Sequence, residues 1–155
     1  MSPKESPSQE YLKNAVLTAT PEQLQLMLYD GVLKFAARAR DAIRAKQREA
    51  AFHALERAQL IVLELSNGIH REINPELADR MSAIYNFIFR RLVEANVHQD
   101  EKALDDALRI LRYERETWLL LIDKLTQEHS GGQPAATSDS NPAADDQTPS
   151  FTAEA

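Results

Sequence analysis

The chain of 155 residues contains no cysteine and only four glycines, and these shortages exclude several kinds of chemistry. Without cysteine there is no disulfide, no cysteine-ligated zinc, no iron–sulfur cluster and no thiol nucleophile. Phosphate-binding loops need clustered glycines, and between residues 20 and 127 the only glycines are Gly31 and Gly68. We therefore expect no enzyme that works through a thiol, a metal–sulfur centre or a phosphate loop.

Long apolar runs are also missing. The longest run built from large side chains, residues 118–122, is far shorter than the roughly 20 residues that span a bilayer. The first ten residues are polar and have no apolar core of the kind that signal peptides carry. We expect a soluble, cytoplasmic protein.

Charge of one sign is concentrated at the end of the chain. The sequence has 18 basic and 24 acidic residues, a net charge of −6 at pH 7. Five of the acids lie at or beyond Glu128 with no base among them, which leaves 18 bases and 19 acids in residues 1–127. A body so close to neutrality argues against a dedicated nucleic-acid binder, which usually has a clear basic excess.

The last part of the chain lacks the residues that build a core. Residues 130–155 contain no Leu, Ile, Val, Met, Lys or Arg, and their one aromatic residue is Phe151. Such a segment buries too little apolar surface to offset the entropy lost on ordering. We expect residues 128–155 to form a disordered acidic tail whose simplest role is solubility.

Four long helices are predicted between residues 21 and 127. The stretch Thr-Pro-Glu-Gln at residues 20–23 is a helix start, because Thr20 can cap, proline suits the first helical position and Gln23 completes a capping box. Asn74 and Asp100 offer two further caps. Apolar residues then recur with helical spacing, and no segment shows the alternation of a half-buried strand. The predicted helices cover residues 21–46, 49–70, 75–97 and 100–127.

Helices of this length with short connections predict an all-α fold, an antiparallel four-helix bundle over residues 21–127. Residues 1–20 lack the same continuous pattern. Their large apolar side chains, Tyr11, Leu12, Val16 and Leu17, interrupt an otherwise polar segment. We expect residues 1–20 to be an N-terminal arm that packs loosely on the bundle or is partly mobile.

The predicted helix over residues 21–46 is apolar on more than one face near its start. Leu24 and Leu28 follow one helical stripe, and Leu26 and Tyr29 mark a second stripe beside it. Such a helix is buried on two sides or lends one face to a partner. Gly31 lies within it, where glycine costs about 1 kcal/mol relative to alanine; the simplest reason for it is the close approach of a neighbouring helix.

The four histidines do not have the spacing of a metal site. Di-iron bundles use Glu-x-x-His, but the residues three positions before His53, His70, His98 and His129 are alanine, asparagine or threonine. A phosphotransfer domain would also be a helical bundle, with an exposed histidine on a helix. His53 and His70 have no supporting motif for that role, so solvent-facing side chains are the simpler interpretation. We predict no catalytic residue, metal or cofactor.

Two basic clusters have more than one interpretation. Five bases lie near the end of the first predicted helix, where a solvated face that complements the helix dipole explains them more simply than an anion site. They are Arg38, Arg40, Arg44, Lys46 and Arg48. Arg90 and Arg91 closely follow Tyr85, Phe87 and Phe89. Either the arginine stems cover these aromatic rings, or the segment forms an amphipathic groove for a peptide partner.

Two stretches of the chain show a family resemblance. Residues 11–31 contain Tyr-x-x-Asn-x-Val-x-Thr-Ala-Thr-Pro and then Leu-x-x-Met-Leu-Tyr-Asp-Gly, and residues 84–96 read Ile-Tyr-Asn-Phe-Ile-Phe-Arg-Arg-Leu-Val-Glu-Ala-Asn. Both stretches, together with Trp118, resemble the flagellin-specific export chaperones called FliS over about residues 11–127. Thr20 stands where the family pattern has serine, Phe87 stands where it has tyrosine, and the tail is longer than the family requires.

The resemblance implies a cytoplasmic, non-enzymatic helical bundle that binds the C-terminal segment of flagellin. Such a chaperone prevents premature polymerisation and delivers flagellin to the flagellar type III export gate, and the family leaves room for a co-chaperone. Its N-terminal arm covers part of the binding surface and moves when flagellin arrives. Two alternatives stay open: a generic helical adaptor with another client, and a phosphotransfer domain that uses His53 or His70.

The resemblance and the helical patterns together suggest the residues that contact the client. Some of these must belong to the core instead, and the sequence does not sort them. The candidates for the flagellin surface are Leu24, Met27, Leu28, Tyr29, Tyr85, Phe89, Arg90 and Asn96. Tyr11 and Val16 are the expected arm contacts, with which flagellin would compete.

Overall fold

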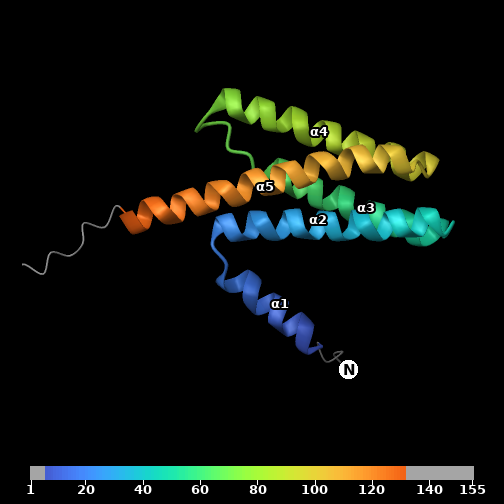
Figure 1. Cartoon of the computed structure of the whole chain (residues 1–155), viewed down its shortest axis with the longest axis horizontal. Coiled ribbons are helices and arrows are strands. Elements are labelled where there is room, and N and C mark those ends of the chain that lie inside the picture. The colour runs from blue at the N-terminus through green and yellow to red at the C-terminus, as the bar shows by residue number, and fades with distance from the viewer. Residues whose placement is uncertain (1–5, 132–155) are drawn as a thin grey trace, which may run out of the picture. The chain divides into compact units, whose positions relative to one another are not determined.

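The computed structural model describes residues 6–131, and this part of the chain is helical throughout apart from short connections (Figure 1). The helices are α1 (Pro7–Thr18), α2 (Pro21–Arg44), α3 (Arg48–Asn67), α4 (Pro75–His98) and α5 (Glu101–Gly131). The all-α prediction is confirmed. Residues up to 120 form one compact unit, and residues 121–131 are the helical start of a second one. The predicted tail beyond residue 131 lies outside the described residues.

The predicted helix starts are present as hydrogen bonds. Thr20 and Gln23 form the expected capping box: the Gln23 amide donates to Thr20 Oγ1 (3.2 Å), and the Thr20 amide donates to Gln23 Oε1 (3.0 Å). Asn74 Oδ1 accepts from the backbone of Leu77 (3.1 Å). Asp100 Oδ1 accepts from two amides at the start of α5, at 2.9 and 3.2 Å. These bonds satisfy amides that the first turn of a helix leaves unpaired.

Within the predicted N-terminal arm, residues 7–18 form a regular helix. The same capping chemistry starts it. Ser6 Oγ accepts from the Gln9 amide (3.3 Å), the Gln9 side chain accepts from the Ser6 amide (3.1 Å), and Pro7 occupies the first turn. No residue of α1 is buried. The helix therefore adds nothing to the hydrophobic core.

The end of α5 differs from the prediction. The helix continues four residues past Gln127, as far as Gly131. Nothing between these positions interrupts a helix, and the Ser130 hydroxyl donates to the Thr126 carbonyl (2.9 Å). Residues 128–131, which were predicted as the beginning of the tail, are therefore helical.

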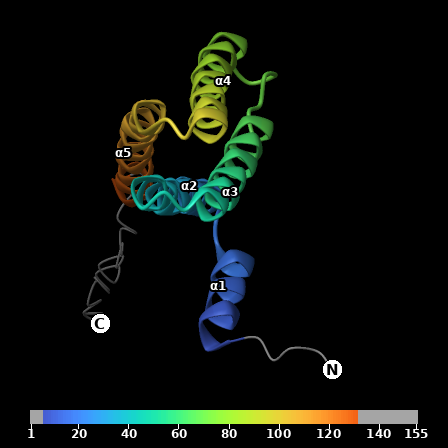
Figure 2. The same ribbon diagram turned by 90° about the vertical axis from the view of Figure 1, so that its right-hand side faces the viewer.

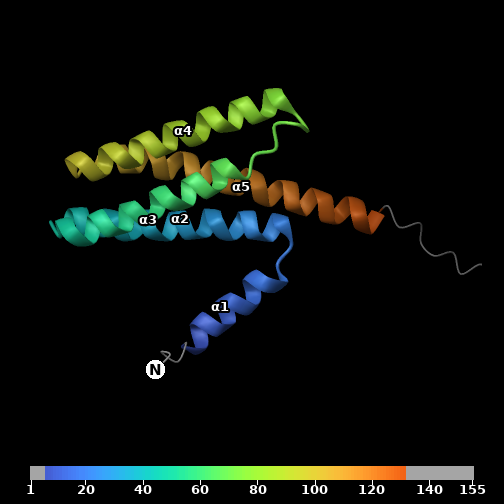
Figure 3. The ribbon, with the colours of Figure 1, turned by 180° about the vertical axis from the view of Figure 1, so that it is seen from behind.

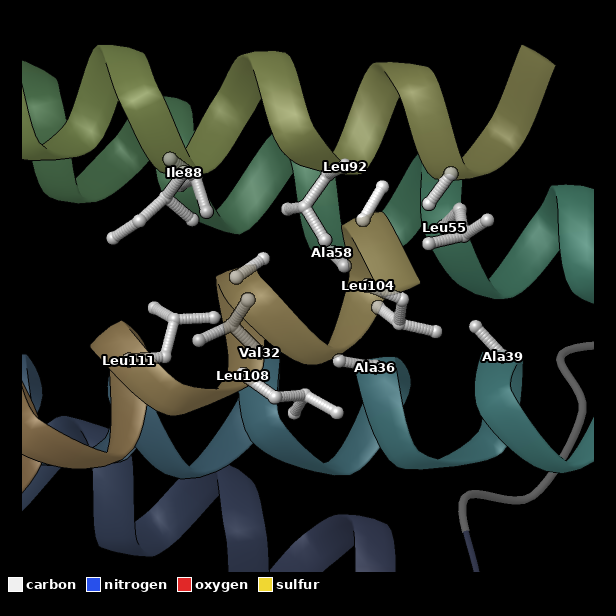
Figure 4. Close-up of a cluster of buried hydrophobic side chains, with 14 of the residues drawn as sticks. Val32, Ala36, Ala39, Leu55, Ala58, Ile88, Leu92, Leu104, Leu108 and Leu111 are labelled. Atoms are coloured by element: carbon white, nitrogen blue, oxygen red, sulfur yellow. The ribbon is translucent and has the colours of Figure 1, made fainter. Parts of the chain in front are cut away.

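The core lies between α2, α3, α4 and the first half of α5, which surround a common interior (Figure 2). Successive helices run antiparallel, with α3 beside both α2 and α4 (Figures 1 and 3). Leucine, isoleucine and valine side chains from all four helices point into this interior, and alanines occupy the positions between them (Figure 4). Small side chains let helix backbones approach closely while the larger ones fill the remaining space.

Close approach also explains the glycine inside α2. A Cβ atom placed on Gly31 would lie 3.3 Å from Cδ1 of Ile61 on α3, which is tighter than ordinary van der Waals contact. The close helix packing predicted at this position is therefore present.

Polar groups cluster at one end of the core. The hydroxyls of Tyr29 and Tyr85 lie 2.6 Å apart with both side chains 1% exposed, and Gln25 Nε2 donates to Tyr85 Oη (3.4 Å). Burial raises the pKa of both phenols. Glu114 of α5 is also buried, and desolvation raises the pKa of its carboxyl group. Its negative charge raises the pKa of both tyrosines further.

Ion pairs fasten α5 to α2 at both ends of the unit. Glu101 Oε1 accepts from Arg44 Nε (2.6 Å) and from Arg40 Nε (3.4 Å), and near the other end Arg115 Nε lies 2.5 Å from Asp30 Oδ1. The interaction with Arg44 is the main reason why the pKa of Glu101 is lowered. Arg40 and Arg44, which were predicted to lie on a solvated basic face, are therefore paired with a carboxylate of α5.

None of the helices among residues 6–131 combines the length and the apolar character that crossing a bilayer requires.

The raised pKa of Glu114 predicts a pH-dependent gain from Glu114→Gln. A carboxyl whose folded-state pKa lies above its unfolded value opposes folding once it ionises, so its contribution to stability falls as pH rises through the folded-state pKa. We expect Glu114→Gln to raise the melting temperature at pH 7. The gain should vanish below about pH 4, where both forms are neutral. Thermal unfolding followed by circular dichroism across this range measures it. Glu116→Gln, an exposed neighbour, is the control, and a destabilised Glu114→Gln at pH 7 would contradict the prediction.

The Gly31 contact predicts coupling between two substitutions. Gly31→Ala gains about 1 kcal/mol of helix propensity but brings a methyl group against Ile61 Cδ1. Ile61→Val removes that atom, so we expect Gly31→Ala to stabilise the Ile61→Val background by more than it stabilises the natural chain. Urea unfolding of all four proteins gives the coupling free energy. Equal gains in both backgrounds would show that the contact does not constrain position 31.

Candidate functional site

A hollow of about 470 Å³ lies between α1 and the start of α2. Its lining combines small and polar side chains with two larger ones, Tyr11 from α1 and Met27 from α2. The full lining is Tyr11, Asn14, Ala15, Thr18, Ala19, Gln23 and Met27. The structure thus brings together one predicted arm residue and one predicted client residue. Val16, the other predicted arm residue, does not line the hollow; Tyr11 is 77% exposed and Val16 is 44% exposed.

The start of α2 keeps apolar side chains at the surface. Leu24, Met27 and Leu28 are all half-buried, and so is Leu26 on the second stripe. Leu28 packs against the core with one side. Leu24 and Met27 are therefore partly accessible from outside, next to a residue that packs on the core.

Two predicted client residues lie in the core. Tyr29 and Tyr85 are each 1% exposed, and their paired hydroxyls face one another. A partner could reach these rings only if α2 and α4 separated. Helical spacing shows that apolar residues share a stripe but does not show which stripe faces inward. For this reason Tyr29 and Tyr85 were among the predicted surface residues.

The predicted residues of α4 lie apart from those of α2. Phe89 is half-buried against the core, Arg90 is exposed, and Asn96 is half-buried near the C-terminal end of the helix. Asn96 lines a separate hollow, about 340 Å³ in volume, together with Phe52 and Val97. Its Oδ1 is buried and has no hydrogen-bond partner among the described residues. The eight candidates thus do not form one compact site.

The two adjacent arginines of α4 have different surroundings. Arg91 is half-buried, and its Nη2 lies 2.5 Å from Asp106 Oδ2 on α5, while its Nη1 pairs with Glu94. The hydrogen bond from Arg91 lowers the pKa of Asp106. Arg90 forms no ion pair with the described residues. Arg91 therefore joins α4 to α5, and Arg90 is the one available to a partner.

Three exposed apolar side chains lie on α3 and are not among the predicted client residues. They are Phe52, Leu60 and Leu63, which are 50%, 57% and 43% exposed. Their spacing along α3 was a signal, because they lie off the stripe formed by Leu55 and Val62.

The described residues hold no group of three or more potential metal ligands. Both histidines considered for phosphotransfer, His53 and His70, are exposed. The nearest carboxylates to His53 are those of Glu49 and Glu56, at 3.8 and 3.9 Å.

Comparison with known proteins agrees with this description. The family model for the flagellar protein FliS matches residues 4–125. A flagellar secretion chaperone FliS from Bacillus subtilis is 36% identical over 127 residues, which cover 82% of this chain and 94% of the relative. The flagellar secretion chaperone FliS from Salmonella typhimurium is 31% identical over 124 residues, covering 79% of this chain and 92% of the relative.

A solved structure supports the fold. The crystal structure of a flagellar chaperone from bacteria superposes with a TM-score of 0.64 at 17% identity, covering 76% of this chain and 95% of the other. Since the family model matches most of the chain and relatives above 30% identity align along nearly their whole length, the chain belongs to the FliS family of flagellar secretion chaperones.

Proposed function

We propose that the chain binds the C-terminal segment of flagellin in the cytoplasm, prevents its premature polymerisation and delivers it to the flagellar type III export gate. The observation that carries this proposal is the half-buried apolar face at the start of α2, next to a helix that buries nothing. A secretion chaperone needs a surface that holds an unfolded client without covalent chemistry. Apolar contact, at about 25 cal/mol per Å² buried, supplies affinity of that kind.

The helix α1 is suited to act as a replaceable cover. It has 12 residues and none of them is buried, and isolated helices shorter than about 12–15 residues are marginal in water. Displacing α1 from its place beside the start of α2 therefore costs little free energy. A client helix that presented larger apolar side chains to Leu24 and Met27 would take its place, and Tyr11 is the contact with which it would compete.

The candidates on α4 provide a second place for the client to bind. Phe89 is half-buried, Arg90 is exposed, and both precede the half-buried Asn96 along the helix. Contacts on both α2 and α4 suit an extended client that becomes ordered as it binds.

The proposal includes an export-gate component and a co-chaperone as further partners. No residue is assigned to either of them. Membership of a chaperone family agrees with the prediction that the chain is not an enzyme, and it gives no support to phosphotransfer through His53 or His70.

Titration of the full chain with a labelled C-terminal flagellin peptide tests the proposal. We expect saturable binding at micromolar concentration. Met27→Glu should weaken it about tenfold or more, because a charge would enter an apolar contact. Tyr11→Ala should strengthen it, because α1 would compete less well. Fluorescence anisotropy measures the affinity of the unchanged chain and of both variants.

Tyr113→Glu is the matched control, since Tyr113 is a 67% exposed side chain on α5, and it should leave the affinity unchanged. Absence of saturable binding would refute the proposal. Equal binding of unrelated amphipathic helices in competition would instead identify a generic adaptor.

A further inference from the structure

A further depression lies between α2 and α3, away from the hollow beside α1. Two adjoining hollows of about 670 and 620 Å³ share Phe35, His53 and Arg57 in their linings. We call the combined depression the Phe35 groove and define it by Phe35, Arg38 and Ala42 of α2 and Ala54, Arg57 and Leu60 of α3. None of these six residues lines the hollow between α1 and α2.

Two arginines hold defined positions over the aromatic ring of the groove. The guanidinium carbons of Arg38 and Arg57 lie 5.5 and 5.7 Å from the centroid of the Phe35 ring. Cations within about 6 Å of an aromatic face are attracted to it. One arginine comes from α2 and the other from α3, so the ring of Phe35 places positive charge from both helices in the same groove.

The pairing of these arginines differs from that of most others. Seven arginines in residues 6–131 form ion pairs with carboxylates: Arg40, Arg44, Arg71, Arg80, Arg91, Arg109 and Arg115. Arg38 and Arg57 have no carboxylate partner within the same residues, although both are exposed. Their N–H groups can therefore donate to an incoming acid.

The groove contains two acidic side chains of its own, Asp41 and Glu56. Glu56 lies 3.9 Å from Nδ1 of His53. Neither acid lies within ion-pair distance of Arg38 or Arg57. The two guanidinium groups thus stay available in spite of their acidic neighbours.

We propose that the Phe35 groove docks an acidic amphipathic helix of a partner protein. Carboxylates of that helix pair with Arg38 and Arg57, and its apolar side chains pack on Phe35 and Leu60. Arginine forms bidentate hydrogen bonds with carboxylates. Amphipathic helices commonly bind by placing their apolar face in a groove. This partner site is additional to the flagellin surface proposed above.

The dimensions of the groove fit a short helix. Its lining on this side runs from Phe35 of α2 to Ala45, the C-cap of the helix, along about 15 Å at about 1.5 Å per residue. That length corresponds to about three turns of a docked helix. Acids spaced three or four residues apart would lie on the face toward the arginines.

Binding of a designed probe tests the proposal on the full chain. The probe is a fluorescein-labelled peptide of about four helical turns with glutamate and leucine at adjacent helical spacings, and its partner probe has lysine at every glutamate. We expect the acidic peptide to bind and the lysine peptide not to bind. Arg38→Glu with Arg57→Glu should lower the affinity about tenfold or more, and the affinity should fall as salt is added.

Arg80→Glu with Arg112→Glu makes the same change in net charge on exposed positions outside the groove. This control should change the affinity by less than about twofold, because the charges lie elsewhere. Thermal unfolding of both double variants, and of Arg38→Gln with Arg57→Gln, verifies that they are folded.

Equal losses in the two glutamate variants would overturn the proposal, since they would reflect overall charge. A single-stranded oligonucleotide that bound as tightly as the acidic peptide would also overturn it. The flagellin peptide should bind the Arg38→Glu, Arg57→Glu variant normally. If that binding were lost too, the groove would belong to the flagellin surface and the separate partner site would be disproved.

Discussion

The alanines inside the bundle determine how closely its four helices pack, and the rest of the structure depends on that packing. Ala36, Ala39, Ala58, Ala95 and Ala107 are completely buried, and with them the four helices pack closely around a narrow interior. An interior at normal protein density has no room for additional large rings. Phe35 and Phe52 therefore lie at or near the surface. The apolar surfaces of this protein are thus a direct consequence of its small core residues.

The helix α2 takes part in two different surfaces because of this arrangement. Its buried stripe faces α3, α4 and α5, so its other positions lie outside the core. Near the start these positions carry Leu24 and Met27, and near the end they carry Phe35 and Arg38. Ion pairs from Arg40 and Arg44 to Glu101, and from Asp30 to Arg115, hold the helix against α5. Both surfaces are therefore presented by a helix that is fixed on the opposite side.

Features that depend on nearby residues could be predicted from the sequence. The caps at Thr20, Asn74 and Asp100 need only a side chain and the next three amides, and all three are present. The same logic applied to Ser6 and Gln9 would have predicted α1. The sparse apolar residues of that segment outweighed the capping signal, and an unburied helix gives only a weak apolar pattern.

Features that depend on which helices pack against each other could not be predicted from the sequence. Periodicity placed Tyr29 and Tyr85 correctly on helices, but the contact between their hydroxyls joins residues 56 positions apart. The pair of Arg91 with Asp106 links two helices in the same way. For the candidate site, the sequence identified the apolar start of α2 and not the groove around Phe35, which requires α2 and α3 together.

The unburied state of α1 separates two properties that are usually linked. In most domains a substitution that alters a binding surface also alters the core beneath it, so affinity and thermal stability change together. Here the residues of α1 contribute nothing to the core. Mutations between residues 7 and 18 are consequently free to adjust how readily a surface is exposed without altering the folding equilibrium of the bundle. The family pattern that passes through Tyr11, Asn14 and Val16 of this helix is therefore not explained by core packing.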